Sequence, residues 1–293
     1  MRPERLRQLV SLLVLVTVSS LAFAQAVPPG ASRTLDRIKS AKEIRVAFSG
    51  DSPPFSSVAA NGEPAGFAID LCRRVIAEIG RAVGEPELRT RWLVGTVAER
   101  IDMVATGKAD LDCANTTTTL TRRREVDFSA LVFVDTGGLL VKEGSPVERV
   151  AGLEGKRLGV LAGTTTEARI QALLKRQGIN ASVVRLADGV EGVAMLESGS
   201  LDAFAADKLK LAGLTAEARA PRSMRVLPDD LSYEPQAFAV PRNDSTFRLE
   251  VDRALSQVYG SGEIERIFAH WLGRLGKPAG LSAAVYLLNV IPE

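Results

Sequence analysis

Histidine and cysteine are scarce in this chain: His270 stands alone, and the cysteines are Cys72 and Cys113. A lone histidine offers no histidine cluster for a metal and no pattern of a catalytic triad, so we expect neither a metal site nor a cofactor. Charge is also nearly balanced. The formal net charge is +2, and the first 24 residues contain three arginines and one glutamate. The rest of the chain is therefore close to neutral, which favours neither a nucleic-acid partner nor a membrane-surface partner.

Residues 1–24 have the pattern of a secretory signal peptide. A basic start is followed by an apolar run from Leu9 to Val18 and then by small residues around Ala24 and Ala26. An uncleaved membrane anchor is the alternative, but the run is shorter than the roughly 20 residues that a span needs. We expect export with cleavage near Ala24 or Ala26. No lipid anchor is expected, because no cysteine stands at the cleavage site.

The two cysteines fall on apolar faces of predicted elements. Cys72 shares a helix face with Ile69 and Ile76, and Cys113 shares a strand face with Leu111. An even number of cysteines in an exported protein favours one disulfide. Two separate buried thiols are the alternative.

Hydrophobic periodicity predicts an α/β protein with two similar units, each running strand–helix–strand–helix–strand. The first unit has strands at 44–48, 88–93 and 109–113 and helices at 66–79 and 100–106, after a short helix at 35–41. The second has strands at 157–161, 182–186 and 201–205 and helices at 167–176, 189–199 and 209–216. Helices at 245–259 and 262–272 close the chain.

Extended segments at 131–141 and 236–240 connect the two units. They predict two lobes with two crossovers, each lobe having its own parallel-core sheet with helices on both faces. The first lobe comprises residues 27–135 and 238–293, and the second comprises residues 140–235. Paired crossovers near 136–140 and 235–241 are typical of a hinge, and a cleft between lobes is the usual place of a small ligand.

Residues Asp110 to Ser129 run from a strand into four consecutive threonines and then three arginines. Hydroxyls, backbone N–H groups and an arginine fork can together hold a carboxylate. We predict that Arg122 binds the α-carboxylate of an amino acid, with Thr117 and Asn115 as donors beside it. A solvated turn with threonine caps is the alternative.

The second unit offers complementary groups. Thr164 and Thr165 precede a helix, where backbone N–H groups favour an anion, although ordinary helix capping is the alternative. Asp207 ends a strand and could take an ammonium group, with capping of the next helix as the alternative. Arg122 and Asp207 would then hold the two charges of a zwitterion across the cleft, and ligand binding would close the hinge.

Several stretches resemble, in order, the solute-binding subunits of polar amino-acid ABC importers, the extracellular solute-binding proteins of family 3. They are Gly66 to Leu71, Asp110 to Ser129, Gly163 to Thr166, Leu196 to Gly199, and Asp202 to Asp207. This resemblance implies the type II periplasmic binding protein fold, a periplasmic location and a membrane permease as partner. It also implies that Arg122 binds the α-carboxylate, Asp207 the α-amino group, and Thr117 and Thr165 the ligand's polar atoms.

The region around Asn115 and the tail after Gly276 most resemble the glutamate/aspartate-binding branch. Arg100 matches an arginine of that branch and would meet an acidic side chain, the alternative being an exposed helix residue. Two positions depart from the branch: Ser49 replaces a basic residue, and Gly189 replaces a polar residue or histidine. The ligand is therefore expected to be a small polar or acidic amino acid.

Three functions compete at this point. The first is a monomeric, non-enzymatic binding protein that delivers an amino acid to a permease. The second is a periplasmic enzyme on the same scaffold, such as a cyclohexadienyl dehydratase, which would need a general acid or base in the cleft. Glu99 is a candidate that no motif places there. The third is a ligand-sensing module, expected to act through a separate partner because no kinase or membrane-spanning segment follows Glu293.

Overall fold

The computed structural model describes residues 31–275, 278 and 280–292, and the residues from Ser32 onward form one compact unit. The predicted signal peptide, residues 1–24, and its cleavage site near Ala24 or Ala26 lie outside the described residues. Within those residues, no helix combines the length and the apolarity that crossing a bilayer requires.

The helices predicted from the 3.6-residue period are confirmed, with ends shifted by a few residues. They are α1 (Arg33–Ala41), α2 (Phe67–Val83), α3 (Val97–Ala105), α4 (Thr165–Gln177), α5 (Gly189–Ser198), α6 (Lys208–Ala216), α7 (Ser245–Gly260) and α8 (Glu263–Leu272). A further helix, α9 (Gly280–Leu288), was not predicted, and short 3-10 turns lie at η1 (Arg122–Arg124), η2 (Val150–Leu153), η3 (Pro221–Ser223) and η4 (Gly273–Leu275).

The strands of the main sheet are β1 (Glu43–Phe48), β5 (Arg89–Val94), β6 (Leu111–Asp112), β7 (Val126–Lys142), β8 (Arg157–Leu161), β9 (Ser182–Leu186), β10 (Ala203–Asp207), β11 (Met224–Val226) and β12 (Ser232–Pro241). Their order is β5-β1-β6-β12-β7-β10-β8-β9, and β11 pairs with β7. A small antiparallel sheet contains β2 (Asp51–Ser52), β3 (Ser56–Val58) and β4 (Pro64–Ala65), with a turn that includes Asn61 and Gly62 between β3 and β4.

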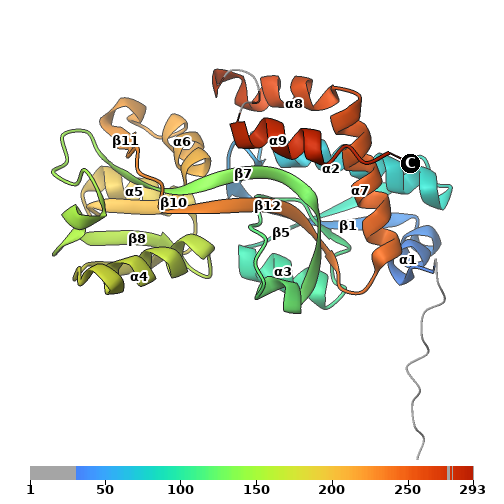
Figure 1. Cartoon of the computed structure of the whole chain (residues 1–293), viewed down its shortest axis with the longest axis horizontal. Helices are drawn as coiled ribbons and strands as arrows, with labels where there is room; N and C mark the ends of the chain where they lie inside the picture. Colours follow the sequence, from blue (N-terminus) through green and yellow to red (C-terminus); the bar gives the residue numbers. More distant parts are fainter. Residues whose placement is uncertain (1–30, 276–277, 279, 293) are drawn as a thin grey trace, which may run out of the picture. The chain divides into compact units, whose positions relative to one another are not determined.

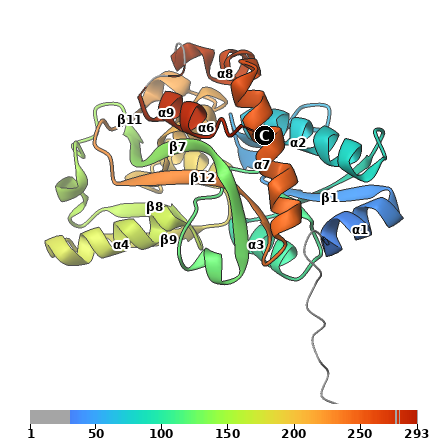
Figure 2. The ribbon, with the colours of Figure 1, turned by 45° about the vertical axis from the view of Figure 1, so that its right-hand side comes forward.

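The prediction of two separate sheets was wrong, because the crossover strands join both units into one mixed sheet. β7 and β12 pair antiparallel from Val126–Pro241 to Gly137–Ser232, and they lie side by side in Figures 1 and 2. β12 continues the hydrogen bonding to β6, and β7 continues it to β10. Hydrogen bonding therefore passes through both crossovers.

Gly137 and Gly138 do not interrupt β7, and their lack of side chains lets other groups approach it. A Cβ on Gly137 would lie 2.6 Å from Ser232 Oγ, and one on Gly138 would lie 2.5 Å from Lys208 Cγ. These glycines therefore allow β12 and the start of α6 to pack directly against the strand.

Helices cover both faces of the sheet at each end, as predicted (Figure 1). We call the β5, β1 and β6 end, with α1–α3 and α7–α9, the β1 half, and the β10, β8 and β9 end, with α4–α6, the β8 half. Each half has a buried apolar cluster on either side of its strands. The exact lobe boundaries given above stay a prediction.

The predicted disulfide is confirmed. Cys72 in α2 is bonded to Cys113, just after β6, with 5.9 Å between the Cα atoms. The bridge fixes α2 to the start of the segment that contains Asn115, Thr117 and Arg122, so it supports one wall of the site described next.

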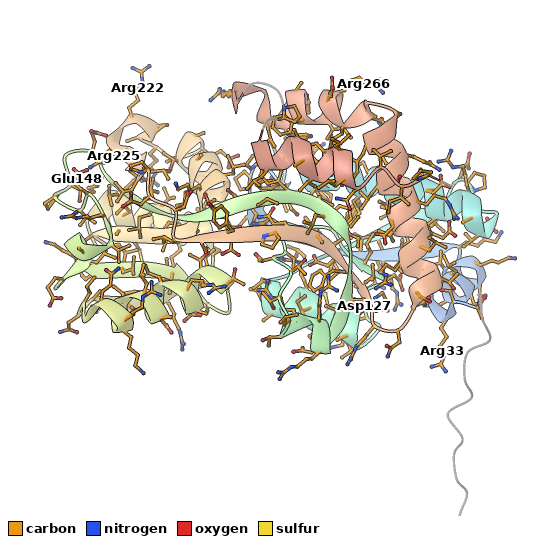
Figure 3. All side chains as sticks on the ribbon, viewed as in Figure 1. Arg33, Asp127, Glu148, Arg222, Arg225 and Arg266 are labelled. Carbon is orange, nitrogen blue, oxygen red and sulfur yellow. A yellow bond between two sulfur atoms is a disulfide. The ribbon has the colours of Figure 1, made fainter. Side chains whose placement is uncertain are left out.

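Charged side chains project outward from both halves, as Arg33, Arg222 and Arg266 show in Figure 3. At the far end of the β8 half, Arg225 pairs with Glu148 at 2.7 Å. Such exposed pairs of mixed sign agree with the nearly neutral composition and stabilise the fold little.

Candidate functional site

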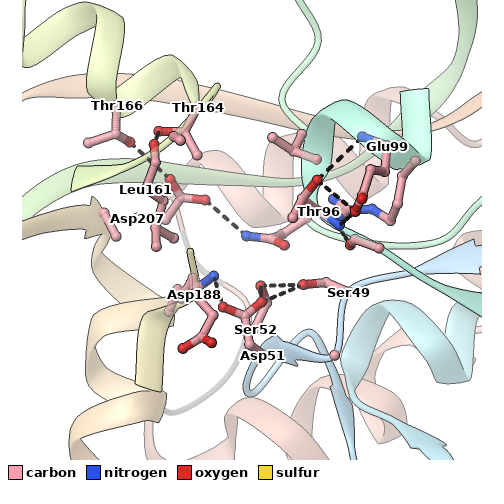
Figure 4. Close-up of a pocket in the computed structure, with 18 of the residues that line it drawn as sticks. Ser49, Asp51, Ser52, Thr96, Glu99, Leu161, Thr164, Thr166, Asp188 and Asp207 are labelled. Carbon is pink, nitrogen blue, oxygen red and sulfur yellow. Dashed lines mark hydrogen bonds and ion pairs between the residues drawn. The ribbon is translucent and has the colours of Figure 1, made fainter. Parts of the chain in front are cut away.

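A cavity of about 440 Å³ lies between the β1 half and the β8 half. Its walls come from residues at or just after the ends of β1, β5, β6, β8, β9 and β10 and from the first turns of α3, α4 and α6. The residues predicted from sequence to bind a ligand all line it: Ser49, Arg100, Asn115, Thr117, Arg122, Thr164, Thr165 and Asp207. Figure 4 shows this polar lining from both halves.

Arg122 begins the short turn η1 after the threonine run, and its guanidinium reaches the cavity. Nη1 donates to the Thr117 carbonyl oxygen at 2.7 Å, which fixes the side chain; no other side-chain hydrogen bond of Arg122 is found among the described residues. Burial, and then repulsion from Arg100, lower the pKa of Arg122. Because its side chain makes this single hydrogen bond among the described residues, most N–H groups of the Arg122 guanidinium remain available for an anion in the cavity.

Asp207 ends β10 and faces Arg122's side of the cavity from the β8 half. Although it stands at the N-cap position of α6, its side chain caps no N–H of that helix among the described residues. Instead it accepts from Asn115 Nδ2 at 3.1 Å and from Gln236 Nε2 at 3.2 Å. The capping alternative was therefore wrong, and the bond from Asn115 to Asp207 joins the two halves.

The Asp207 carboxyl is buried beside other acids. Burial, and then the nearby Glu234, raise the pKa of Asp207 to about 6. Burial together with Asp207 also raises the pKa of Asp135 well above its usual value. An incoming ammonium group would favour the ionised form of Asp207, because it would add an opposite charge directly beside this buried carboxylate.

The start of α4 uses its two threonines differently. Thr164 is the N-cap: its hydroxyl accepts from Glu167 N at 3.1 Å, so the capping interpretation holds for this residue. Thr165 Oγ1 points the other way, 2.7 Å from Glu234 Oε2 and 3.4 Å from Thr117 Oγ1. Thr117 and Thr165 therefore meet across the cavity.

Arg100 is buried in α3, and its interpretation as an exposed helix residue was wrong. Its Nε donates to Asp112 at 2.9 Å, Nη2 to Thr116 at 3.1 Å, and Nη1 to the Gly95 carbonyl at 2.8 Å. These bonds hold the guanidinium against the cavity wall next to Arg122.

Ser49 lies in a polar group that sequence reasoning only partly found. Its hydroxyl donates to Asp51 at 2.9 Å and lies 2.9 Å from the hydroxyl of Ser52. Asp51 also accepts from Lys210 Nζ at 3.0 Å and from Gly189 N at 2.7 Å in the β8 half. Lys210 and Asp51 were missed, because nothing in the sequence alone tells whether a charge on a helix or turn points into a cavity.

Phe55 does not line the cavity but belongs to the core: it is 1% exposed and packs edge-on against Phe67 and Phe133. No group of three or more His, Cys, Asp or Glu side chains in the described part of the chain is arranged to hold a metal ion. Glu99 lies at the cavity edge, where bonds from the Thr96 backbone and hydroxyl lower its pKa.

Two α/β halves that share a sheet and enclose a polar cavity of this size define a binding protein for a small molecule. The chain belongs to the bacterial extracellular solute-binding proteins, family 3, whose family model matches residues 44–274.

Relatives agree with this assignment. The chain is 32% identical to the L-glutamate/L-aspartate-binding protein of Pseudomonas aeruginosa over 93% of its own length and 90% of the relative. It is similar to a crystal structure of a solute receptor for L-cysteine of Neisseria gonorrhoeae, with a TM-score of 0.74, 25% identity and coverage of 86% and 98% of the two chains. It is also similar to an ancestral amino-acid-binding protein described as a precursor of cyclohexadienyl dehydratase, with a TM-score of 0.69, 26% identity and coverage of 82% and 99%.

Proposed function

We propose that this protein is the periplasmic substrate-binding component of an ABC importer, which binds one small polar or acidic amino acid between two lobes and delivers it to a membrane permease. The observation that carries the proposal is the position of Arg122 and Asp207, which reach one cavity from opposite halves of the molecule. Family membership and the amino acids named for the relatives support it.

In this proposal the α-carboxylate lies against the Arg122 guanidinium, the Thr117 and Thr165 hydroxyls and the first N–H groups of α4. The α-amino group lies against Asp207, which Asn115 orients from the other half. A zwitterion thus brings one counter-charge to each half, its carboxylate to Arg122 and its ammonium group to Asp207.

Calorimetry with a panel of the common amino acids tests the proposal. We expect at least one ligand to bind with a Kd around micromolar, about −8 kcal/mol. Arg122→Ala should weaken binding by about 2–5 kcal/mol, because it leaves the ligand carboxylate buried without its partner.

Arg124→Ala is the matched control, since Arg124 follows in the same turn with an exposed side chain. It should bind like the wild type. Retention of binding within a few-fold by Arg122→Ala would contradict the carboxylate role of Arg122.

We further propose that the two lobes close on the ligand about residues 136–140 and 235–241. Three contacts that cross the cavity support this: Asn115 to Asp207, Thr117 to Thr165, and Asp51 to Gly189. Small-angle X-ray scattering of the free and the ligand-saturated protein tests it. A radius of gyration that does not fall on saturation would contradict closure.

Location and assembly are part of the same proposal: a periplasmic monomer from which a signal peptide has been removed. Terminal sequencing of the exported protein should find a start at Gln25 or Val27. An unprocessed Met1 on the exported protein would contradict cleavage.

The enzymatic alternative keeps one favourable observation, the buried Asp207 carboxyl with a pKa of about 6. A general acid needs a pKa near the working pH, and Glu99, with its lowered pKa at the cavity edge, does not meet this condition. Turnover of prephenate or arogenate by the purified protein, lost in Asp207→Asn, would establish the enzyme and displace the binding function.

A further inference from the structure

An ion pair inside the cavity is not used by the head group of the proposed ligand. Lys210 Nζ lies 3.0 Å from Asp51 Oδ2 and joins α6 of the β8 half to β2 of the β1 half. In Figure 4, Asp51 lies with Ser49 and Ser52 on a different part of the wall from Thr164 and Thr166. The pair is therefore placed to meet a ligand side chain.

Asp51 is fully engaged. One carboxylate oxygen accepts from the Ser49 hydroxyl and, at 3.5 Å, from that of Ser52; the other accepts from Gly189 N and Lys210. Although burial opposes it, Lys210 and the Gly189 N–H lower the pKa of Asp51, so it is ionised at neutral pH. With both oxygens occupied, Asp51 has little capacity left for a cationic ligand side chain.

Lys210, in contrast, keeps unused donors. Its side chain is 7% exposed and lines the cavity. An ammonium has three N–H groups, and among the described residues Lys210 donates only to Asp51. Asp51 fixes the position of the ammonium, and the remaining N–H groups can donate to an oxygen atom in the cavity.

Two of the three basic side chains that line the cavity already have an acidic partner. Arg100 is paired with Asp112, and Lys210 is paired with Asp51. Arg122 and Asp207 are left for the carboxylate and ammonium groups of the ligand. A side-chain carboxylate would therefore enter a buried site in which each of these cations already has a partner, which is unfavourable.

We propose that Lys210 is a specificity-determining residue, held by Asp51, and that the ligand is an amino acid whose side chain is an uncharged carboxamide. The carboxamide oxygen accepts from Lys210, and its NH₂ group donates to the hydroxyl oxygens of Ser49 and Ser52. The ligand would thus differ from the acidic amino acids named for the Pseudomonas relative. This inference rests on the proposed function, since it needs Arg122 and Asp207 to hold the head group.

Wild-type calorimetry with glutamine, asparagine, glutamate, aspartate, arginine and alanine gives the first test and needs no variant. An amide should bind at least tenfold more tightly than the matching acid and than arginine. If no amino acid binds, the proposed function fails. If an amino acid binds but glutamate exceeds glutamine and aspartate exceeds asparagine, the proposed function stands and this inference is overturned.

Two substitutions should then change the preference for an amide ligand over an acidic ligand in different ways. Lys210→Met should weaken binding of the amide at least tenfold and change alanine binding less than threefold, because alanine has no side-chain oxygen to lose. Asp51→Asn leaves Lys210 without a counter-charge and should raise the ratio of acid to amide affinity at least tenfold. A merely structural role for the pair would weaken all ligands alike.

Lys175→Met is the control for the loss of one lysine, because Lys175 is exposed on α4 away from the cavity lining. Thermal unfolding verifies that each variant is folded before titration. An unchanged acid-to-amide ratio in folded Asp51→Asn overturns the proposal, and the wild-type panel decides it if that variant does not fold.

Discussion

The same arginine–aspartate arrangement occurs in both halves of the molecule, and the two copies differ in burial. In the β1 half, Arg45 of β1 donates its backbone N–H and its guanidinium to Asp110, just before β6. In the β8 half, Arg157 of β8 does the same with Asp202, just before β10. Asp110 is nearly fully buried, whereas the Asp202 side chain is 31% exposed.

Five residues after each aspartate comes a residue of the site. Asn115 follows Asp110 and Asp207 follows Asp202, and these two side chains hydrogen-bond to each other across the cavity. The halves thus place equivalent strand ends face to face, and one carries a neutral amide where the other carries a titratable acid. The comparison teaches that a repeated local pattern can differ in energy and in chemistry according to what surrounds it.

Asp110→Ala should have the largest effect on stability. It leaves two arginines, Arg37 and Arg45, beside an empty and buried position, and breaking a buried ion pair in this way costs about 3–5 kcal/mol. Urea unfolding followed by circular dichroism measures the loss. If Asp110→Ala lowers the free energy of unfolding no more than Asp202→Ala does, the two arginine–aspartate pairs do not differ in their contribution to stability.

Removing the disulfide comes next. Cys72→Ala with Cys113→Ala opens a loop of 41 residues and should lower the free energy of unfolding by about 2–4 kcal/mol, because the unfolded chain gains freedom. The variant should match the reduced wild type in the same titration. If both unfold like the oxidised protein, the bridge contributes nothing to the rigidity of the β1 half.

Asp207 is titratable and Asn115 is not, so a pH dependence of ligand binding would report on Asp207. The pKa of Asp207 is about 6 in the folded protein, with Glu234, Asp135, Lys210 and Arg122 around it. A ligand ammonium needs the ionised form, so affinity should be constant well above pH 6 and fall as the pH drops through it, by roughly tenfold between pH 7.5 and pH 5. Calorimetry at both values measures this.

The same raised pKa has the opposite effect on folding: lower pH weakens ligand binding but stabilises the folded state. The pKa of Asp207 is higher in the folded protein than in the unfolded chain, so protonation of this carboxyl stabilises the folded state. This stabilisation is complete below the unfolded pKa near 4 and is lost as the pH rises through about 6. In Asp207→Asn this part of the pH dependence of unfolding should disappear.

If affinity for ligand in the wild type is the same at pH 5 and pH 7.5, Asp207 is not the ammonium partner.

Asp202→Ala should have the smallest effect. Its partner Arg157 is half exposed, and solvent and salt screen such pairs. We expect a midpoint close to that of the wild type in the urea titration. Ligand affinity should also stay the same, since the altered group lies outside the cavity lining.

Sequence periodicity predicted the helices well where one face is apolar and the other polar, as in α2. It missed α9, because Gly280–Leu288 is apolar nearly all round and has no contrasting face. It also missed β2 and β4, which are two residues long. Strand propensity finds segments but not their partners, so the pairing of β7 with β12 that unites the sheet could not be predicted.

Several candidate residues could be placed at the cavity from the sequence for a related reason. Asn115, Asp207 and Thr165 follow or begin elements whose ends converge at the cavity, and parallel topology brings such ends together. Arg100, Asp51 and Lys210 were harder, because nothing in a single sequence tells whether a charge on a helix or turn points inward. Only the fold gives the Lys210–Asp51 pair.

The unbroken sheet limits how the halves can move. Strands β7 and β12 remain hydrogen-bonded to each other through the segment where bending is proposed, so a movement of one half must deform both strands together. Closure would then bend or twist this pair of strands as one unit. Elastic recovery of the paired strands β7 and β12 would then help to reopen the protein once the ligand has left.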